Sequence, residues 1–170
     1  GLREAVDQVS VPPEIEVAHL GIDVVGTRSD YGPFQSEKIP FLFFSGGEHP
    51  DYHTPRDTSD RLDYQRVANV AGIIEGVCRE VTEAEAPPQW IDRPKFDLAE
   101  IRTLHHITEL LLKLDEQAEG TQRPKLNPLQ RFTVSNMKQK TAQILERGTV
   151  VPEDRPGIVR NAQLLLLTVF

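Results

Sequence analysis

The side chains best suited to chemistry lie between residues 29 and 60, where two polar loops bracket an apolar run at 39–44. Ahead of the run, Asp30 and Tyr31 precede a Gly-Pro turn, and behind it His53 lies in a Tyr-His-Thr-Pro turn. The proline in the second turn fixes the backbone, so that the imidazole can be aimed. An imidazole can bind a metal or transfer a proton near neutral pH. We therefore expect chemistry at the two ends of the 39–44 run.

Regular elements must position these side chains. The run at 39–44 is apolar throughout, which is typical of a strand buried on both faces, and the alternation at 14–20 predicts a second strand. In an α/β fold, loops at strand ends carry functional side chains to one edge of the sheet. Apolar residues recur every three or four positions from 63 onward and predict a helix that ends before a Pro-Pro pair. The sequence thus predicts an α/β fold for residues 1–86.

The second half of the chain has a different pattern. A proline-rich linker is expected at 87–96, followed by a mostly helical extension at 97–170. Apolar spacing and capping residues predict helices over 98–114 and 127–147. A third helix is expected near the end, although the apolar run at 164–170 would also suit a strand.

The two loops and the run between them read S-D-Y-G-P-F, then an Ile-Pro run, then D-Y-H-T-P-R-D-T-S-D. In order and spacing this stretch resembles the last two motifs of the co-catalytic zinc exopeptidases, a family that includes bacterial leucyl-type aminopeptidases and has the glutaminyl cyclases as relatives. The resemblance covers roughly the first half of the chain. It implies that residues 1–86 are the C-terminal portion of a mixed-sheet zinc aminopeptidase-like domain.

The resemblance also implies roles for four residues. His53 would be a ligand of one ion in a two-zinc site, Asp30 an acidic group beside the metal that orients a ligand or handles a proton, and Tyr31 and Tyr52 would bind substrate. Tyr31 stands where many members of the family have histidine, although tyrosine occurs there too. The residues alone leave other interpretations open. His53 would then be a loop histidine bonded to backbone, Asp30 a carboxylate bonded to its own turn, and Tyr52 a residue that shapes the loop.

The earlier motifs of that family have no counterpart in this sequence. They are an H-x-D loop, an adjacent Glu-Glu pair that includes the general base, and one more acidic ligand, all placed ahead of the S-D-Y-G-P-F element. Only 28 residues precede Ser29, and the chain contains no Glu-Glu dipeptide. We therefore expect at most a weak partial zinc site in this chain, because a single imidazole holds zinc weakly and hydrolysis needs a base near the metal-bound water.

These observations predict a C-terminal fragment of a zinc-dependent exopeptidase, with an aminopeptidase favoured, that is inactive by itself. Two alternatives remain. One is a glutaminyl-cyclase-like enzyme on related machinery. The other is an interaction module that has lost its metal and whose helical extension binds a partner.

The remaining candidate residues predict less. His49 has the H-x-D spelling but comes only four residues before His53, which indicates a loop position. His105 and His106 are neighbours on a predicted helix and point about 100° apart, so they cannot share a metal as an i, i+4 pair can. Cys78 falls on the apolar stripe of its predicted helix, which favours a small buried side chain over a nucleophile.

Composition restricts the partners. A net charge of −7 without a basic cluster argues against nucleic acid. No apolar run reaches the ~18 residues of a membrane span. A single cysteine and a first residue that is glycine leave the compartment open, with a secreted or periplasmic parent among the possibilities. The expected partners are a peptide substrate, and either a second copy, bound through an unpaired sheet edge and the run at 164–170, or the N-terminal part of the parent.

Overall fold

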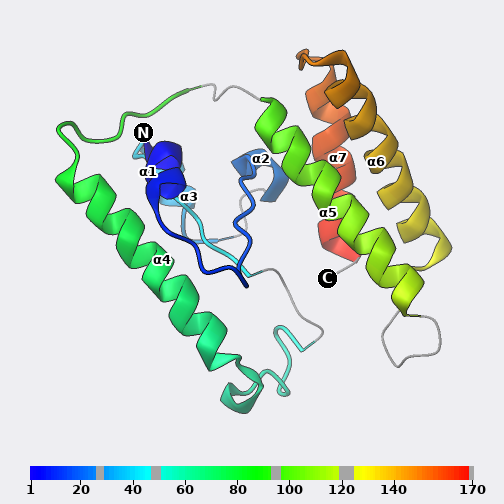
Figure 1. Cartoon of the computed structure of the whole chain (residues 1–170), viewed down its shortest axis with the longest axis horizontal. Coiled ribbons are helices and arrows are strands. Elements are labelled where there is room, and N and C mark those ends of the chain that lie inside the picture. The colour runs from blue at the N-terminus through cyan, green and yellow to red at the C-terminus, as the bar shows by residue number, and fades with distance from the viewer. Residues whose placement is uncertain (26–28, 47–50, 93–96, 119–124, 169–170) are drawn as a thin grey trace. The chain divides into compact units, whose positions relative to one another are not determined.

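The computed structural model describes residues 1–25, 29–46, 51–92, 97–118 and 125–168, and its regular elements are helical (Figure 1). In chain order these elements are α1 (Leu2–Gln8), α2 (Ile22–Val25), α3 (Gly32–Ser36), the 3-10 helix η1 (Ser59–Arg61), α4 (Tyr64–Glu83), α5 (Leu98–Gln117), α6 (Pro128–Arg147) and α7 (Asp154–Thr168).

The chain forms two compact units. Unit 1 comprises residues 1–17 and 28–93, and unit 2 comprises residues 18–27 and 94–170. The short segment that contains α2 therefore groups with helices that come much later in the sequence.

The predicted α/β fold, with residues 1–86 as part of a mixed-sheet domain, is wrong. The described part of the chain contains no β-strand, and residues 39–46 have no regular secondary structure. Within that segment the side chains of Ile39 and Phe43 are 48% and 42% exposed, so the run is not a buried strand. The physical reason is that an apolar or alternating pattern reports only which side chains avoid water, whereas a strand also needs a neighbour to pair its backbone N–H and C=O groups.

Unit 1 is built around α4, the long helix that the sequence predicts after Asp63. The Asp63 carboxylate caps the helix by accepting a hydrogen bond from the backbone N–H of Arg66 at 3.0 Å. Its buried side chains, Ile73 and Val77, lie on the face that packs against α1. Cys78 is exposed, which contradicts its predicted burial. The apolar stripe of α4 is wider than the surface that α1 covers.

Close contact between α1 and α4 depends on a glycine. A Cβ atom placed on Gly76 would lie 2.8 Å from Cγ1 of Val9, the residue directly after α1. Carbon atoms in proteins do not approach so closely, so the glycine allows the turn after α1 to rest on the α4 backbone. On the same helix Gly72 has nothing within 4 Å of its Cβ position.

Unit 2 is a bundle in which α6 packs against both α5 and α7, and α2 packs against α7 (Figure 1). Both predicted helices, over 98–114 and 127–147, are confirmed as α5 and α6. The third is confirmed as α7, which runs through the described part of the 164–170 run as helix and not as strand. The core consists of buried apolar side chains from all four helices, namely Val24, Ile101, Leu104, Val134, Met137, Ile144, Ile158, Ala162 and Leu165.

The ends of α6 show why the sequence predicts it well. Asn127 and Gln130 form a capping box in which each side chain accepts a hydrogen bond from the other's backbone N–H, at 2.9 and 2.7 Å. At the other end, Gly148 has a φ of 73°, the left-handed conformation in which helices commonly stop. The helix is therefore set by local signals at both ends.

A cluster of charges attaches α2 to unit 2. The Arg155 guanidinium donates hydrogen bonds to Asp23, which follows the first residue of α2, and to Glu100 on α5 at 2.7 Å. Burial by itself lowers the pKa of Arg155, but the hydrogen bonds to Asp23 and Glu100 outweigh it and raise the pKa above its ordinary value. The same Glu100 accepts from the backbone N–H of Gly21. Residues 21–25 are thus held by side chains from α5 and α7.

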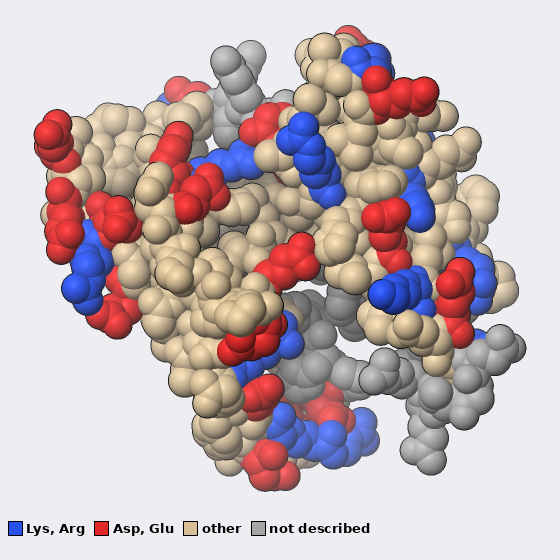
Figure 2. Space-filling model, viewed as in Figure 1, with Lys and Arg blue, Asp and Glu red and all other residues tan. Residues whose placement is uncertain are grey.

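Charged side chains are dispersed over the surface. Acidic and basic groups are interspersed on the face shown in Figure 2, with no continuous basic surface among its described residues. None of the described helices is both long enough and apolar enough to cross a bilayer.

Candidate functional site

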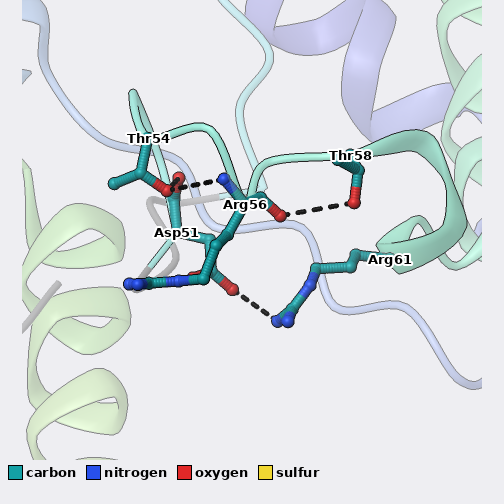
Figure 3. Close-up of polar contacts among 5 residues, drawn as sticks. All are labelled: Asp51, Thr54, Arg56, Thr58 and Arg61. Carbon is teal, nitrogen blue, oxygen red and sulfur yellow. Dashed lines mark hydrogen bonds and ion pairs between the residues drawn. The ribbon is translucent and has the colours of Figure 1, made fainter.

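The loop at 51–61 is fixed by a buried carboxylate. Asp51 is 9% exposed, and its two oxygens accept hydrogen bonds from Nε of Arg56 at 2.7 Å and Nη1 of Arg61 at 2.5 Å. Figure 3 shows the Arg61 side chain directed at this carboxylate, with the Arg56 side chain running beside it. Charge-assisted hydrogen bonds of this kind are about twice as strong as neutral ones. Asp51 therefore holds two later parts of the loop to its start.

Threonine hydroxyls complete the loop (Figure 3). Oγ1 of Thr54 donates to the carbonyl of Asp51 at 2.7 Å and accepts from the backbone N–H of Arg56 at 3.2 Å, while Oγ1 of Thr58 donates to the Arg56 carbonyl at 3.3 Å. The backbone N–H groups of Thr54 and Asp57 donate to carbonyls three residues earlier, at 3.0 and 3.1 Å. Successive turns therefore define the backbone around His53.

His53 lies inside this loop with its side chain exposed. Its φ of 58° is left-handed, a conformation that few residues other than glycine adopt and that histidine tolerates better than most. Its ring stacks on the ring of Tyr52, with centroids 3.9 Å apart and planes 20° from parallel. The structure thus brings the predicted metal ligand and one predicted substrate residue together. Their roles in metal and substrate binding remain predictions.

Asp30 and Tyr31 lie in a different environment. The side chain of Tyr31 is buried, and its ring stacks on Phe41 with centroids 5.3 Å apart and meets Phe43 edge-on at 5.1 Å. Asp30 is exposed just ahead of α3. The Tyr31 ring therefore joins the S-D-Y-G-P-F element to the apolar run at 39–44, and the assignment of Asp30 to catalysis and Tyr31 to substrate binding remains a prediction.

Sequence reasoning missed Asp51 and Arg56. Asp51 belongs to the H-P-D triplet, which the sequence indicates as loop, and the Arg56 side chain is 69% exposed although its Nε donates to Asp51. The available signal was the spacing of Asp51, Arg56 and Arg61 at five-residue intervals in a loop with two threonines. When two arginines follow one aspartate this closely, each can donate a hydrogen bond to one of the two carboxylate oxygens.

The described residues do not assemble a zinc centre. Catalytic zinc sites use three protein ligands and leave a position for water. Within the described ranges, no group of three or more His, Cys, Asp or Glu side chains is placed to hold a metal ion. His49 lies outside the described residues. The donors that the described residues place around His53 are therefore too few to complete the zinc centre that the resemblance implies.

The histidines of α5 have a packing role. Nδ1 of His105 lies 2.8 Å from Oγ1 of Thr141 on α6, and its Nε2 lies 3.6 Å from Glu109 one turn along α5. The Thr141 hydroxyl also lies 2.9 Å from the carbonyls of Met137 and Lys138 on its own helix. His105 thus links α5 to α6.

Comparison with known proteins identifies one segment. The family model of peptidase family M28 matches residues 10–77, which include both loops and most of α4. No curated protein and no solved structure matches the chain. M28 is the co-catalytic zinc exopeptidase family, so the match confirms the resemblance carried by the two motifs. Residues 10–77 are therefore similar to a segment of the metallopeptidases of family M28.

Proposed function

We propose that this chain supplies the C-terminal side of a zinc-dependent exopeptidase of the aminopeptidase type, which removes N-terminal residues from peptides. The observation that carries the proposal is the M28 match over residues 10–77, together with the D-Y-H-T-P-R-D-T-S-D motif that it contains. A zinc centre needs further imidazole and carboxylate ligands and a general base, and the chain contains no Glu-Glu pair to provide them. In the proposal these groups come from another part of the parent protein.

The local structure around His53 supports a ligand role. The imidazole is exposed, while its backbone is held by the Asp51 hydrogen bonds and its ring by the stack on Tyr52. A metal ligand must be accessible to the ion and must keep its orientation, and supporting contacts usually provide that orientation. Asp30 is proposed as the nearby carboxylate that orients a ligand or holds a proton.

The proposal includes association with the missing part of the parent. Ile39, Leu42 and Phe43 are 48%, 38% and 42% exposed in one continuous segment between the two motifs. Apolar side chains gathered in this way favour burial against another surface. The segment adjoins Tyr31 through Phe41 and Phe43, so a partner that covers it would lie close to the first motif.

A second candidate is an interaction module that has lost its metal. The observation that favours it is that the described residues gather no group of three potential ligands. Under this alternative, unit 2 would bind a partner and the motif loop would have only a structural role. The two candidates differ in whether His53 affects turnover.

The test uses the protein encoded by the full reading frame that contains this sequence. We expect zinc-dependent hydrolysis of an aminoacyl-anilide, with no hydrolysis when the substrate's amino group is acetylated, because an aminopeptidase requires a free N-terminus. His53→Ala should lower kcat/KM by roughly 1000-fold or more with the fold intact, whereas His106→Gln on the exposed face of α5 should change it little.

Three results would overturn the proposal. The first is a reading frame without upstream H-x-D and Glu-Glu motifs. The second is near-normal activity of His53→Ala. The third is metal-dependent turnover by the 170-residue chain alone, because that chain contains no Glu-Glu pair to act as base.

A further inference from the structure

A groove of about 360 Å³ lies between α6 and α7 in unit 2. It is formed by two stripes, one on each helix, at positions three or four residues apart along the chain. Because α6 and α7 are joined by a six-residue connection, they run antiparallel, and the start of α6 lies beside the end of α7. Cavities of this size accommodate small ligands or a few residues of a peptide.

One end of the groove is apolar and exposed. Leu129 and Phe132 in the first turns of α6 are 69% and 67% exposed, and Leu164 on α7 is 41% exposed. All three line the groove. Large apolar side chains gathered in a hollow are a common feature of binding sites, whereas scattered ones need no explanation.

The other end is basic. Lys140 on α6 and Arg160 on α7 line it. Within the described residues, the charged group of neither side chain forms an ion pair or donates a hydrogen bond. Gly157 allows Lys140 to approach α7, since its Cβ position lies 3.3 Å from the Lys140 Nζ atom. Two unneutralised cations share one hollow in a chain whose net charge is −7. The hollow is therefore complementary to an anion.

Two amide side chains lie between these ends. Asn136 on α6 and Asn161 on α7 line the middle of the groove, and Nδ2 of Asn161 is buried without an acceptor in the described structure. A buried donor is normally paired, and one left unpaired in a binding site suits an acceptor that a ligand brings. An asparagine side chain both donates and accepts, which matches the N–H and C=O of a peptide group.

We propose that the α6–α7 groove binds a peptide segment of a partner protein that carries a large apolar side chain and a carboxylate. The carboxylate lies between Lys140 and Arg160, the apolar side chain rests on Leu129 and Phe132, and Asn161 donates to a backbone carbonyl between them. A fatty acid would satisfy the two ends but offers no peptide groups for the amides. This inference does not depend on the proposed peptidase activity.

The helix geometry sets the spacing in the peptide. Phe132 and Lys140 are eight residues apart on α6, which corresponds to about 12 Å along the helix axis. An extended peptide advances about 3.3 Å per residue. The apolar residue and the acidic residue of the ligand should therefore be separated by about three or four positions.

The experiment measures fluorescence anisotropy of labelled peptides with the 170-residue chain. The probe is an extended peptide with Phe and Glu about four positions apart, prepared in both orders, with Glu→Gln peptides as controls. We expect one order to bind and its Gln version to bind at least ~10-fold more weakly. Lys140→Glu and Arg160→Glu should each weaken binding at least ~10-fold, whereas Lys113→Glu, the same charge change on an exposed position of α5, should change it less than ~3-fold.

Asn161→Ala separates a binding role from a structural one. Removal of a buried unpaired donor should raise the chain's resistance to unfolding while the peptide affinity falls. If stability and affinity both fell, or if neither changed, the assignment of Asn161 to the ligand would be wrong. The proposal as a whole is overturned if neither peptide order binds, if Lys113→Glu weakens binding as much as the groove variants do, or if anionic lipid vesicles bind and the peptides do not.

Discussion

Glu100 accepts a hydrogen bond at 2.7 Å from the backbone N–H of Gly21, a residue 79 positions earlier in the chain. The other oxygen of the same carboxylate accepts from Arg155, so one buried side chain joins three distant parts of the sequence. Gly21 lies inside the segment that matches family M28, whereas Glu100 and Arg155 lie outside it. The helical half of the chain therefore fixes part of the peptidase-like segment ahead of Asp30.

The first prediction concerns this charge cluster. Arg155→Met removes the guanidinium and leaves the Glu100 carboxylate buried without a cation, and we expect the free energy of unfolding to fall by about 2–3 kcal/mol. This expected loss is smaller than the loss from breaking a fully buried ion pair, because Asp23, the other carboxylate paired with Arg155, has a side chain that is 46% exposed. Chemical denaturation of the full chain measures it.

Two comparisons make this test specific. Adding Glu100→Gln to Arg155→Met should recover part of the loss, because the neutral amide can stay buried at lower cost. Arg79→Met, which breaks an exposed pair with Glu75 on α4, should cost less than about 0.5 kcal/mol. A double variant as unstable as the sum of its single variants would show that the two side chains are not coupled.

The second prediction compares two glycines of α4. Gly72→Ala should stabilise unit 1 by up to about 1 kcal/mol, because alanine favours helix and its Cβ would meet no atom within 4 Å. Gly76→Ala should destabilise it by about 1–3 kcal/mol, since its Cβ would press on Val9. Thermal unfolding of both variants measures these changes in stability. A Gly76→Ala variant that is more stable than the native chain would contradict the packing of α1 on α4.

The third prediction concerns Asp51. Asp51→Ala leaves Arg56 and Arg61 without their acceptor, so the loop that carries His53 should open more often. We expect the amides of Thr54 and Asp57 to exchange hydrogen at least ~10-fold faster, given that hydrogen bonds to charged groups contribute about 1.5–3 kcal/mol. Glu80→Ala on the exposed side of α4 provides the control and should leave these rates unchanged. Equal exchange in the Asp51 variant would show that the turns alone hold the loop.

The fourth prediction concerns pH. A hydrogen bond from Lys138 keeps the pKa of the exposed Glu109 carboxyl below its ordinary value of 4.5. The ionised form is thus favoured in the folded state, so the stabilisation is complete above the unfolded-state pKa and is lost as pH falls through the lower folded-state pKa.

The melting temperatures of the native chain and Glu109→Gln measure this effect. The difference between them should shrink as the pH is lowered past about 4.5. It should also shrink at about 1 M salt, because an exposed pair is screened. A difference that persists at about pH 2 would mean that Glu109 acts through packing.

The helices could be predicted from the sequence because their signals are local. Carboxylate or amide caps at Asp63, Asp97 and Asn127 start α4, α5 and α6, and Gly148 ends α6, as the spacing of apolar residues indicates. The motif at 51–60 also identified the family, since it depends on residue order and not on fold. These features need no knowledge of distant contacts.

The incorrect predictions all required such knowledge. A strand at 39–44 depends on a neighbouring strand that pairs with its backbone. In the described chain this segment instead packs Phe41 and Phe43 against the Tyr31 ring. Burial of Cys78 depends on how much of α4 its neighbour α1 covers. The attachment of α2 to unit 2 depends on residues at positions 100, 155 and 163, which no local pattern around Asp23 reveals.

The placement of α2 in unit 2 has a consequence for biosynthesis. Asp23 leaves the ribosome 132 residues before its partner Arg155. At ordinary translation rates of about 5–20 residues per second, that interval lasts roughly 7–26 s. During this time residues 28–93, the later part of unit 1, emerge, while the residue that binds Asp23 has not yet been synthesised. The hydrogen bonds between Asp23 and Arg155 cannot form during that delay, so unit 2 can complete its fold only late in synthesis.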